Sequence, residues 1–259
     1  MSAIQDSLSS LGLAEPAILI LLPIVFLAFV MKGMTGFGPG IVIVPIAALL
    51  FGAREAVLLI GILDLASNTV IVTTDRAARA HRFWLPMAVA MIAGSIAGGA
   101  LLRFVPQRDY TILLAIVVAV VGAWFLSGRR TRQGQTLMSD LPAKVRPVDL
   151  GVALASGLFG GLFGLAGLLI AWYLGSLFTK ELFRRVIVHI LLVSAAARVL
   201  TYAATGMLTT EVLLLAAGAI PLLLAGLFCG DRLLPGISEH WFGRVIGIVL
   251  LIAAGRMML

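Results

Sequence analysis

The sequence predicts an all-α integral membrane protein with two inverted-topology repeats, each a glycine-broken helical hairpin followed by three transmembrane helices. Three observations lead to this fold class. The 259 residues are 61% hydrophobic and only 12% charged, with a mean hydropathy of +1.12, whereas soluble domains carry about a quarter charged residues. Glycines interrupt two long apolar stretches at corresponding places in two halves of the chain. Basic residues then gather in the loops on one side of the bundle.

Apolar runs divide the chain, and most have about the length of one membrane crossing. They are Pro16–Phe51, Ala56–Thr73, Phe83–Leu102, Tyr110–Leu126, Leu150–Phe178, Val186–Ala203, Glu211–Phe228 and Trp241–Met258. As single helices, the first would extend about 54 Å and the fifth about 43 Å, against a hydrocarbon core of about 30 Å. Each of these two runs must therefore turn back, as a hairpin or as a pair of short spans.

Glycine-rich stretches mark the turning points. The first, FVMKGMTGFGPGIVIVP, covers Phe29–Pro45, and the second, SGLFGGLFGLAGLLIAWY, covers Ser156–Tyr173. Glycine loosens the backbone and proline removes a donor, so neither favours a continuous helix. Sliding the first stretch by about 128 residues places Gly33 on Gly161, Gly36 on Gly164 and Pro39 on Gly167. Paired breaks of this kind are typical of a transporter's binding site, although glycines also serve close helix packing alone.

The distribution of basic residues favours the hairpins. If each broken run returns to the side it entered, one side holds most of the loop arginines and lysines. That side carries Arg76, Arg79, Arg82, Arg129, Arg130, Arg132, Lys144, Arg146, Lys180, Arg184, Arg185, Arg232 and Arg244, and the other carries Arg54, Arg103, Arg108 and Arg256. Single crossings would divide them almost evenly. The positive-inside rule therefore predicts hairpins, with both termini outside the cytoplasm.

The predicted organisation is a first membrane repeat over 1–128, a cytoplasmic linker over 129–148 and a second repeat over 149–259. The net charge of +7 fits basic cytoplasmic loops, so no nucleic-acid partner is expected. The single cysteine, Cys229, excludes an internal disulfide. The first residues, MSAIQDSLSSLG, lack the basic region of a cleavable signal. We find no enzyme, cofactor or metal motif.

Polar residues inside the apolar runs are candidate functional groups because charges in membrane spans are costly. Lys32 stands at the first break, Asp64 lies mid-span with Asn68 one turn later, and Arg198 follows Ser194 by one turn. Half-helices that restart after Pro39 and Gly167 would direct their N-terminal amides at one point, where an anion could bind. The predicted substrate-binding residues are Lys32, Gly33, Thr35, Gly36, Gly38, Gly40, Asn68, Gly161, Gly164, Gly167, Ser194 and Arg198.

Two alternatives concern the charged residues. Lys32 could pair with Asp64 for structural reasons or contact the substrate, and Asp64 is the candidate proton carrier if transport is coupled to protons. Arg198 could belong to the site or extend its side chain toward the nearer membrane surface. On that second reading, replacing Arg198 would affect binding less than replacing Lys32.

The chain resembles the sulfite/organosulfonate exporter family, TauE/SafE, also known as the 4-toluene sulfonate uptake permease family. The resemblance covers nearly the whole chain. It rests on GMTGFGPGIVIVP, GLFGGLFGLAG, PMAVAMIAGSIAGGALL, YAATGML and PLLLAGLFCGDRLLPGISEHWFGRVIGIVLLIAAG. The second repeat departs from a richer glycine pattern at Ala166 and Leu168, and has Tyr173 where the first has Pro45. The resemblance implies export of small sulfur-containing or carboxylate anions across a bacterial inner membrane.

We therefore expect a multi-pass transporter of a small anion, most simply a sulfonate or sulfite, whose other partner is the lipid bilayer. A passive anion channel is the first alternative, because a membrane potential already drives anions outward at about 2.3 kcal/mol per charge per 100 mV. A non-transporting scaffold or intramembrane enzyme is the second. The oligomeric state, monomer or homodimer, stays open.

Overall fold

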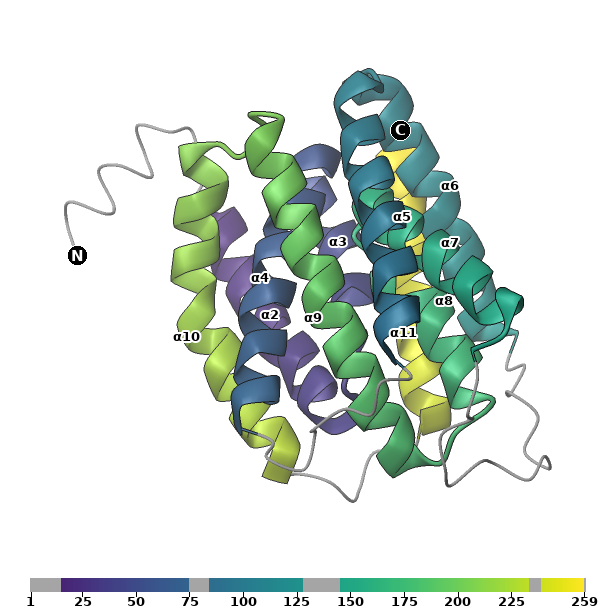
Figure 1. Ribbon diagram of the computed structural model, residues 1–259. Helices are drawn as coiled ribbons and strands as arrows, with labels where there is room; N and C mark the ends of the chain where they lie inside the picture. The colour runs from purple at the N-terminus through teal and green to yellow at the C-terminus, as the bar shows by residue number, and fades with distance from the viewer. Residues whose placement is uncertain (1–14, 75–83, 128–144, 233–238, 259) are drawn as a thin grey trace.

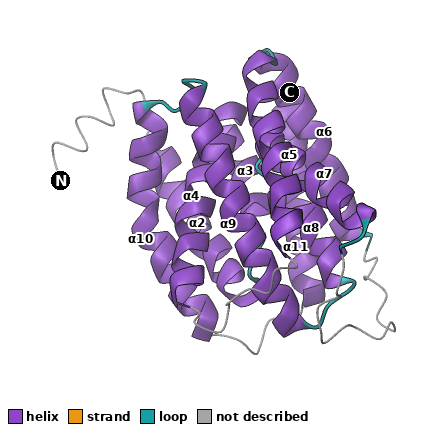
Figure 2. Ribbon diagram, viewed as in Figure 1, coloured by secondary structure: helices purple, strands orange, loops and turns teal. Residues whose placement is uncertain are grey.

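The structure, a computed structural model, describes residues 15–74, 84–127, 145–232 and 239–258. Over these ranges every regular element is a helix, and no strand is present among them (Figure 2). The predicted all-helical fold class is confirmed. The helices pack side by side into one bundle (Figure 1).

The described helices are numbered α2 to α11 in chain order. Their bounds are α2 (Glu15–Thr35), α3 (Pro39–Phe51), α4 (Ala53–Thr74), α5 (Trp84–Phe104), α6 (Gln107–Leu126), α7 (Pro147–Phe163), α8 (Ala166–Gly175), α9 (Lys180–Ala204), α10 (Thr210–Arg232) and α11 (Glu239–Met258). Of these, α2, α4, α5, α6, α9 and α10 each offer 20 to 23 residues that are long and apolar enough to cross a membrane. The chain is therefore a multi-pass membrane protein.

Three of the described turns between helices mark one end of the bundle. The α3–α4, α5–α6 and α9–α10 turns lie at the upper end in Figure 1, whereas α4, α6 and α10 finish at the lower end. Arg54 of the upper end donates from Nη2 to the carbonyl of Val105, 2.8 Å away, in the α5–α6 turn. The predicted linker over 129–148 lies mostly outside the described residues, since only 145–148 are described.

Both long apolar runs break at the predicted glycines, but into arms of unequal length. In the first run α2 has 21 residues and α3 has 13, and in the second α7 has 17 and α8 has 10. The chain passes between arms through left-handed glycines, Gly36 (φ 84°) and Gly38 (φ 99°) in the first break and Gly164 (φ 70°) in the second, a conformation that L side chains rarely adopt. Helix α3 begins at Pro39, and α8 begins at Ala166, one residue before the predicted Gly167.

Helix α8 folds back along α7. The Tyr173 hydroxyl near the end of α8 donates to Asp149 in the first turn of α7. The same carboxylate accepts from Arg146 Nη2 at 3.2 Å, which ties the foot of this hairpin together.

Each long arm packs against a helix from the other half of the chain. A Cβ on Gly94 of α5 would lie 2.1 Å from the Leu154 carbonyl oxygen of α7, and one on Gly98 would lie 2.4 Å from that of Leu158, so these two helices run parallel. Helices α2 and α10 pack the same way, because Gly226 and Gly230 meet the backbone of Phe26 and Val30. Small residues permit this approach. Some glycines of this sequence therefore do serve packing.

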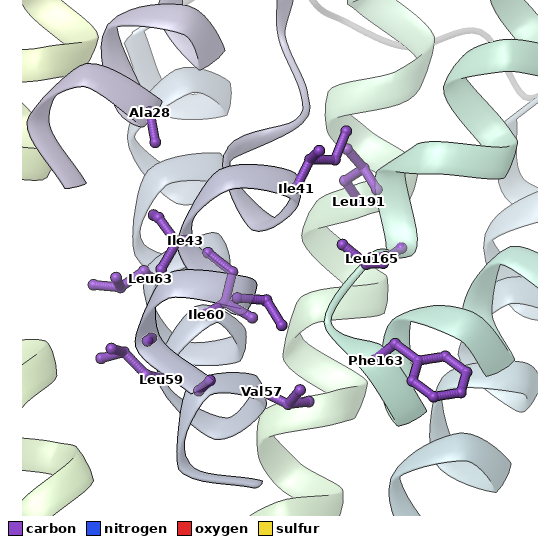
Figure 3. Close-up of a cluster of buried hydrophobic side chains, with 14 of the residues drawn as sticks. Ala28, Ile41, Ile43, Val57, Leu59, Ile60, Leu63, Phe163, Leu165 and Leu191 are labelled. Atoms are coloured by element: carbon purple, nitrogen blue, oxygen red, sulfur yellow. The ribbon is translucent and has the colours of Figure 1, made fainter. Parts of the chain in front are cut away.

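The apolar core surrounds the two breaks. Figure 3 shows Ile41 of α3, Leu165 of the second break and Leu191 of α9 converging from three segments that are distant in sequence. Ile43 and Ile60 are fully buried beside them. The breaks therefore lie in the protein interior, as irregular backbone at membrane depth requires.

Candidate functional site at the two helix breaks

The two breaks meet at the centre of the bundle. A Cβ on Gly40 would lie 2.5 Å from the Gly164 carbonyl oxygen, and one on Gly167 would lie 3.8 Å from the Gly38 amide nitrogen. The first residues of α3 and α8 therefore lie side by side. Together with α4 and α9 they enclose a cavity of about 10 Å³. That volume holds at most one water molecule, so the centre is closed in this conformation.

A buried ion cluster borders this cavity. Lys32 Nζ lies 2.8 Å from Asp64 Oδ1 and donates to Ser67 Oγ at 2.7 Å. Arg198 Nη2 lies 3.1 Å from Asp64 Oδ2. Both cationic residues are 0% exposed. The cluster thus joins α2, α4 and α9, and its single carboxylate faces two cations.

Remote side chains hold the second break. Where α7 ends, its last carbonyls lose their helical partners. Arg198 Nη1 donates to the Gly160 carbonyl at 3.3 Å, the Tyr202 hydroxyl donates to that of Gly161 at 2.7 Å, and the Tyr110 hydroxyl donates to that of Leu162. Side chains of α9 and α6 therefore bond three consecutive carbonyls at the end of α7, and the Gly160 carbonyl also accepts from the Gly164 amide at 3.0 Å.

Local contacts hold the first break. Thr35 Oγ1 lies 2.9 Å from both the Met31 and the Phe37 carbonyl oxygens, and the Gly36 amide donates to the Lys32 carbonyl at 2.7 Å. Each of these groups belongs to the break itself or to the preceding turn. The glycine conformation and one hydroxyl thus close the end of α2.

The centre favours negative charge. The first amides of α3 and α8 have no intrahelical partner, and each helix start acts as roughly half a positive charge. Two cationic side chains face one carboxylate there. With these groups ionised, the described part of the site carries one positive charge that no side chain balances. Such a site suits a small anion.

Several predicted site residues gather at the central cavity. Those lining it are Lys32, Gly38, Gly40, Gly164 and Gly167, together with Asp64. Arg198 reaches the same cluster through Asp64.

The other predicted residues lie elsewhere. Thr35 is exposed and bonds within its own break. Gly36 faces the side chain of Arg184, and Gly161 packs against α5. Ser194 Oγ shares a hydrogen bond of 2.8 Å with Ser95 Oγ of α5. Gly33 lines a second, larger cavity.

The interpretation of Arg198 as a residue reaching for the nearer membrane surface is wrong. Its side chain is 0% exposed and is committed to Asp64 and to the Gly160 carbonyl. The reason for expecting a smaller effect from its replacement is therefore removed, and the relative effect on binding stays a prediction. The pairing of Lys32 with Asp64, in contrast, is present.

Three supporting residues were missed from the sequence. Ser67 lies three residues after Asp64, on the same helical face, and this spacing could have identified it. Tyr202 lies one turn after Arg198, with the same kind of signal. Tyr110 carries no sequence signal, because its partner Leu162 is 52 residues away.

Fold and site together define a multi-pass membrane protein with two broken helices and a buried ionic cluster at their meeting point. Breaks of this type occur in secondary transporters. The family model described as "Sulfite exporter TauE/SafE" matches residues 21–257, and the chain belongs to this family of membrane transporters. The resemblance seen in the sequence is confirmed. No curated protein and no solved structure matches the chain.

Proposed function

We propose that this protein exports a small anion, most simply sulfite or a sulfonate, which binds where the starts of α3 and α8 meet beside Lys32. One observation carries the proposal: two half-helix N-termini and two buried cations converge around a single carboxylate. Two helix starts together contribute roughly one positive charge, and the cluster adds one unbalanced cation, so the site attracts a small anion. The family to which the chain belongs supports export as the activity.

We also propose that the halves 1–128 and 149–259 are inverted repeats. Helices α2 to α6 correspond to α7 to α11 in this scheme. The parallel packing of α2 with α10 matches that of α7 with α5, and each half begins with a broken pair. This arrangement supports two states that alternate in access around the central site.

The proposed setting is a bacterial inner membrane with both termini in the periplasm and the 129–148 linker in the cytoplasm. The basic asymmetry of the sequence supports this orientation. We expect an impermeant thiol reagent to reach a cysteine placed at Gln135 only from the cytoplasmic side, with Cys229→Ser as background. Labelling of Gln135→Cys from the periplasm would reverse the proposed orientation.

Binding measurements test the central site. Sulfite, sulfoacetate and acetate are titrated into detergent-purified protein, followed by calorimetry or thermal shift. We expect Lys32→Met to weaken anion binding about tenfold to a hundredfold, the equivalent of one charge-assisted hydrogen bond. Asp64 and Arg198 remain paired in this variant, so it should still fold. If no anion stabilises the wild type while a cation or neutral solute does, the proposed substrate class is wrong.

A further inference from the structure

We propose that the larger cavity at the lower end of the bundle is the anion entry chamber and that Asn68 is the amide ligand passing the anion from it to the centre. This inference rests on the proposed function and adds the path by which the anion reaches the central site. The chamber has a volume of about 630 Å³, enough for a hydrated small anion, and lies among α2, α4, α9 and α10. Its lining includes Gly33, which lies in the last turn of α2 and directly follows the central Lys32.

The chamber carries two arginines, one from each of two helices. Arg232 ends α10 and holds its guanidinium over the Phe228 ring, 4.0 Å from the centroid. Arg184 comes from the first part of α9, and its Cγ would lie 3.5 Å from a Cβ on Gly36. Cationic groups in a recess lined by low-dielectric walls raise the local concentration of anions. The cavity is thus suited to collect anions close to the first break.

Asn68 lies between the chamber and the centre. Asp64, Asn68 and Ile71 follow one another at helical spacing on one face of α4. Asp64 lines the central cavity and Ile71 lines the chamber. Helix α4 runs from the upper to the lower end of the bundle (Figure 1). Along this helix, Asn68 therefore lies between the residue that lines the central cavity and the residue that lines the chamber.

The side chain of Asn68 is buried without a partner. It is 0% exposed, and neither Nδ2 nor Oδ1 has a hydrogen bond within the part of the chain that the structure describes. An unpaired buried amide is unfavourable for folding. Its Nδ2 can donate to an oxyanion in transit, which gives the amide a partner that the closed conformation lacks. Loss of this amide should therefore affect flux and not stability.

The charge of the chamber can be measured without knowing the substrate. In a Cys229→Ser background, Val70→Cys in the chamber wall is labelled with an anionic sulfonatoethyl and a cationic trimethylammonioethyl methanethiosulfonate. Leu208→Cys, at the upper end in the α9–α10 turn and also half-buried, is the matched control. We expect the anionic-to-cationic rate ratio at Val70 to exceed that at Leu208 about tenfold. Arg232→Gln should reduce this ratio severalfold, and Arg184→Gln further. Equal ratios at both positions would refute the proposal that the chamber concentrates anions.

Asn68→Leu tests the amide ligand. The change removes the unpaired polar atoms at similar volume, so we expect an equal or higher melting temperature together with at least a tenfold loss of sulfite flux in proteoliposomes. Thr69→Val is the matched control, because Thr69 is exposed and its hydroxyl donates to the Leu65 carbonyl within α4. Normal flux in Asn68→Leu would refute the ligand role, and so would a loss of flux that merely follows a loss of folded protein.

The outcomes separate this inference from the proposed function and from lipid binding. Suppose that anions bind the wild type, but the arginine variants change neither the labelling ratio nor the KM for transport of anion added on the cytoplasmic side. The central binding site is then supported, and the chamber's role in anion entry is refuted. If no anion binds the wild type, the proposed function fails first. A lipid phosphate could occupy the same arginines. It would lower the anionic labelling rate in phosphatidylglycerol vesicles relative to phosphatidylcholine vesicles, and that result would assign the chamber to lipid instead.

Discussion

The two helix breaks do the same geometric task with different means. In the first break, left-handed glycines and Thr35 close the end of α2 through contacts within a few residues. In the second, Arg198, Tyr202 and Tyr110 reach across from α9 and α6 to bond three successive carbonyls of α7. Both helix ends keep one local bond from a left-handed glycine amide, Gly36 to the Lys32 carbonyl and Gly164 to the Gly160 carbonyl. The second break differs because it also depends on side chains from the assembled bundle.

Asp64 connects these two kinds of break. It accepts from Lys32, which belongs to the helix before the first break, and from Arg198, which also holds the second. A change at the first break can therefore reach the second through one carboxylate. The proposed alternation between two access states would use such a connection, and variants of Asp64 and its partners can test it.

The largest effect is expected at Asp64. Asp64→Asn leaves two buried cations facing a neutral side chain, which should destabilise the protein by about 3–5 kcal/mol. Adding Lys32→Met should recover part of this loss, because only Arg198 then lacks a charge partner. Adding Arg198→Met instead should recover less, because the Gly160 carbonyl then loses one of its two donors as well. Thermal unfolding of the three variants in detergent measures the difference.

The same variant tests proton coupling. If Asp64 carries protons, Asp64→Asn should lose the pH dependence of flux and still bind the anion. A normal pH profile in Asp64→Asn would exclude that role and leave Asp64 as the counter-charge of Lys32 and Arg198.

An intermediate effect is expected at the left-handed glycines. Gly36→Ala and Gly164→Ala should each cost about 1–2 kcal/mol for the left-handed conformation. Gly164→Ala should cost about 1–3 kcal/mol more, because its Cβ would lie 2.6 Å from Ile60 Cγ2, whereas the nearest atom to a Gly36 Cβ is 3.5 Å away. Leucine at either position should abolish transport. Gly151→Ala is the control, since among the described residues no atom beyond its own stretch of helix backbone lies within 4 Å of a Cβ added there. Equal losses at both breaks would contradict this ranking.

The smallest effects separate remote from local support. Tyr202→Phe leaves the buried Gly161 carbonyl without its donor and should cost about 1–3 kcal/mol. Thr35→Val removes a hydroxyl at an exposed position where water can replace it, so the cost should be below about 1 kcal/mol. Melting temperatures of the two variants give the comparison, and a larger loss in Thr35→Val would show that the first break is not locally determined.

The sequence allowed the helical membrane fold and both breaks to be predicted, and the pairing of Lys32 with Asp64 was one of two alternatives that it left open. Each of these depends on composition, on glycine and proline conformation, or on the high cost of a lone buried charge. The support of the second break could not be predicted to the same extent. Tyr110 and Leu162 are distant in sequence, and an aromatic hydroxyl carries no signal for its partner. The unequal lengths of the two helices in each broken run were also not predicted, because apolar composition does not determine the residue at which a helix ends.

The glycine contacts between the long arms have a consequence for how the chain can be assembled. Helix α2 is locked against α10, and α7 against α5, with backbones so close that no side chain fits at Gly230 or Gly94. The first helix of each half thus packs against the other half, as an exchanged element does between two subunits in domain swapping. Neither half, produced alone, would have a surface to receive its own long arm. We therefore expect that a cut in the 129–148 segment is tolerated only when both fragments are made together.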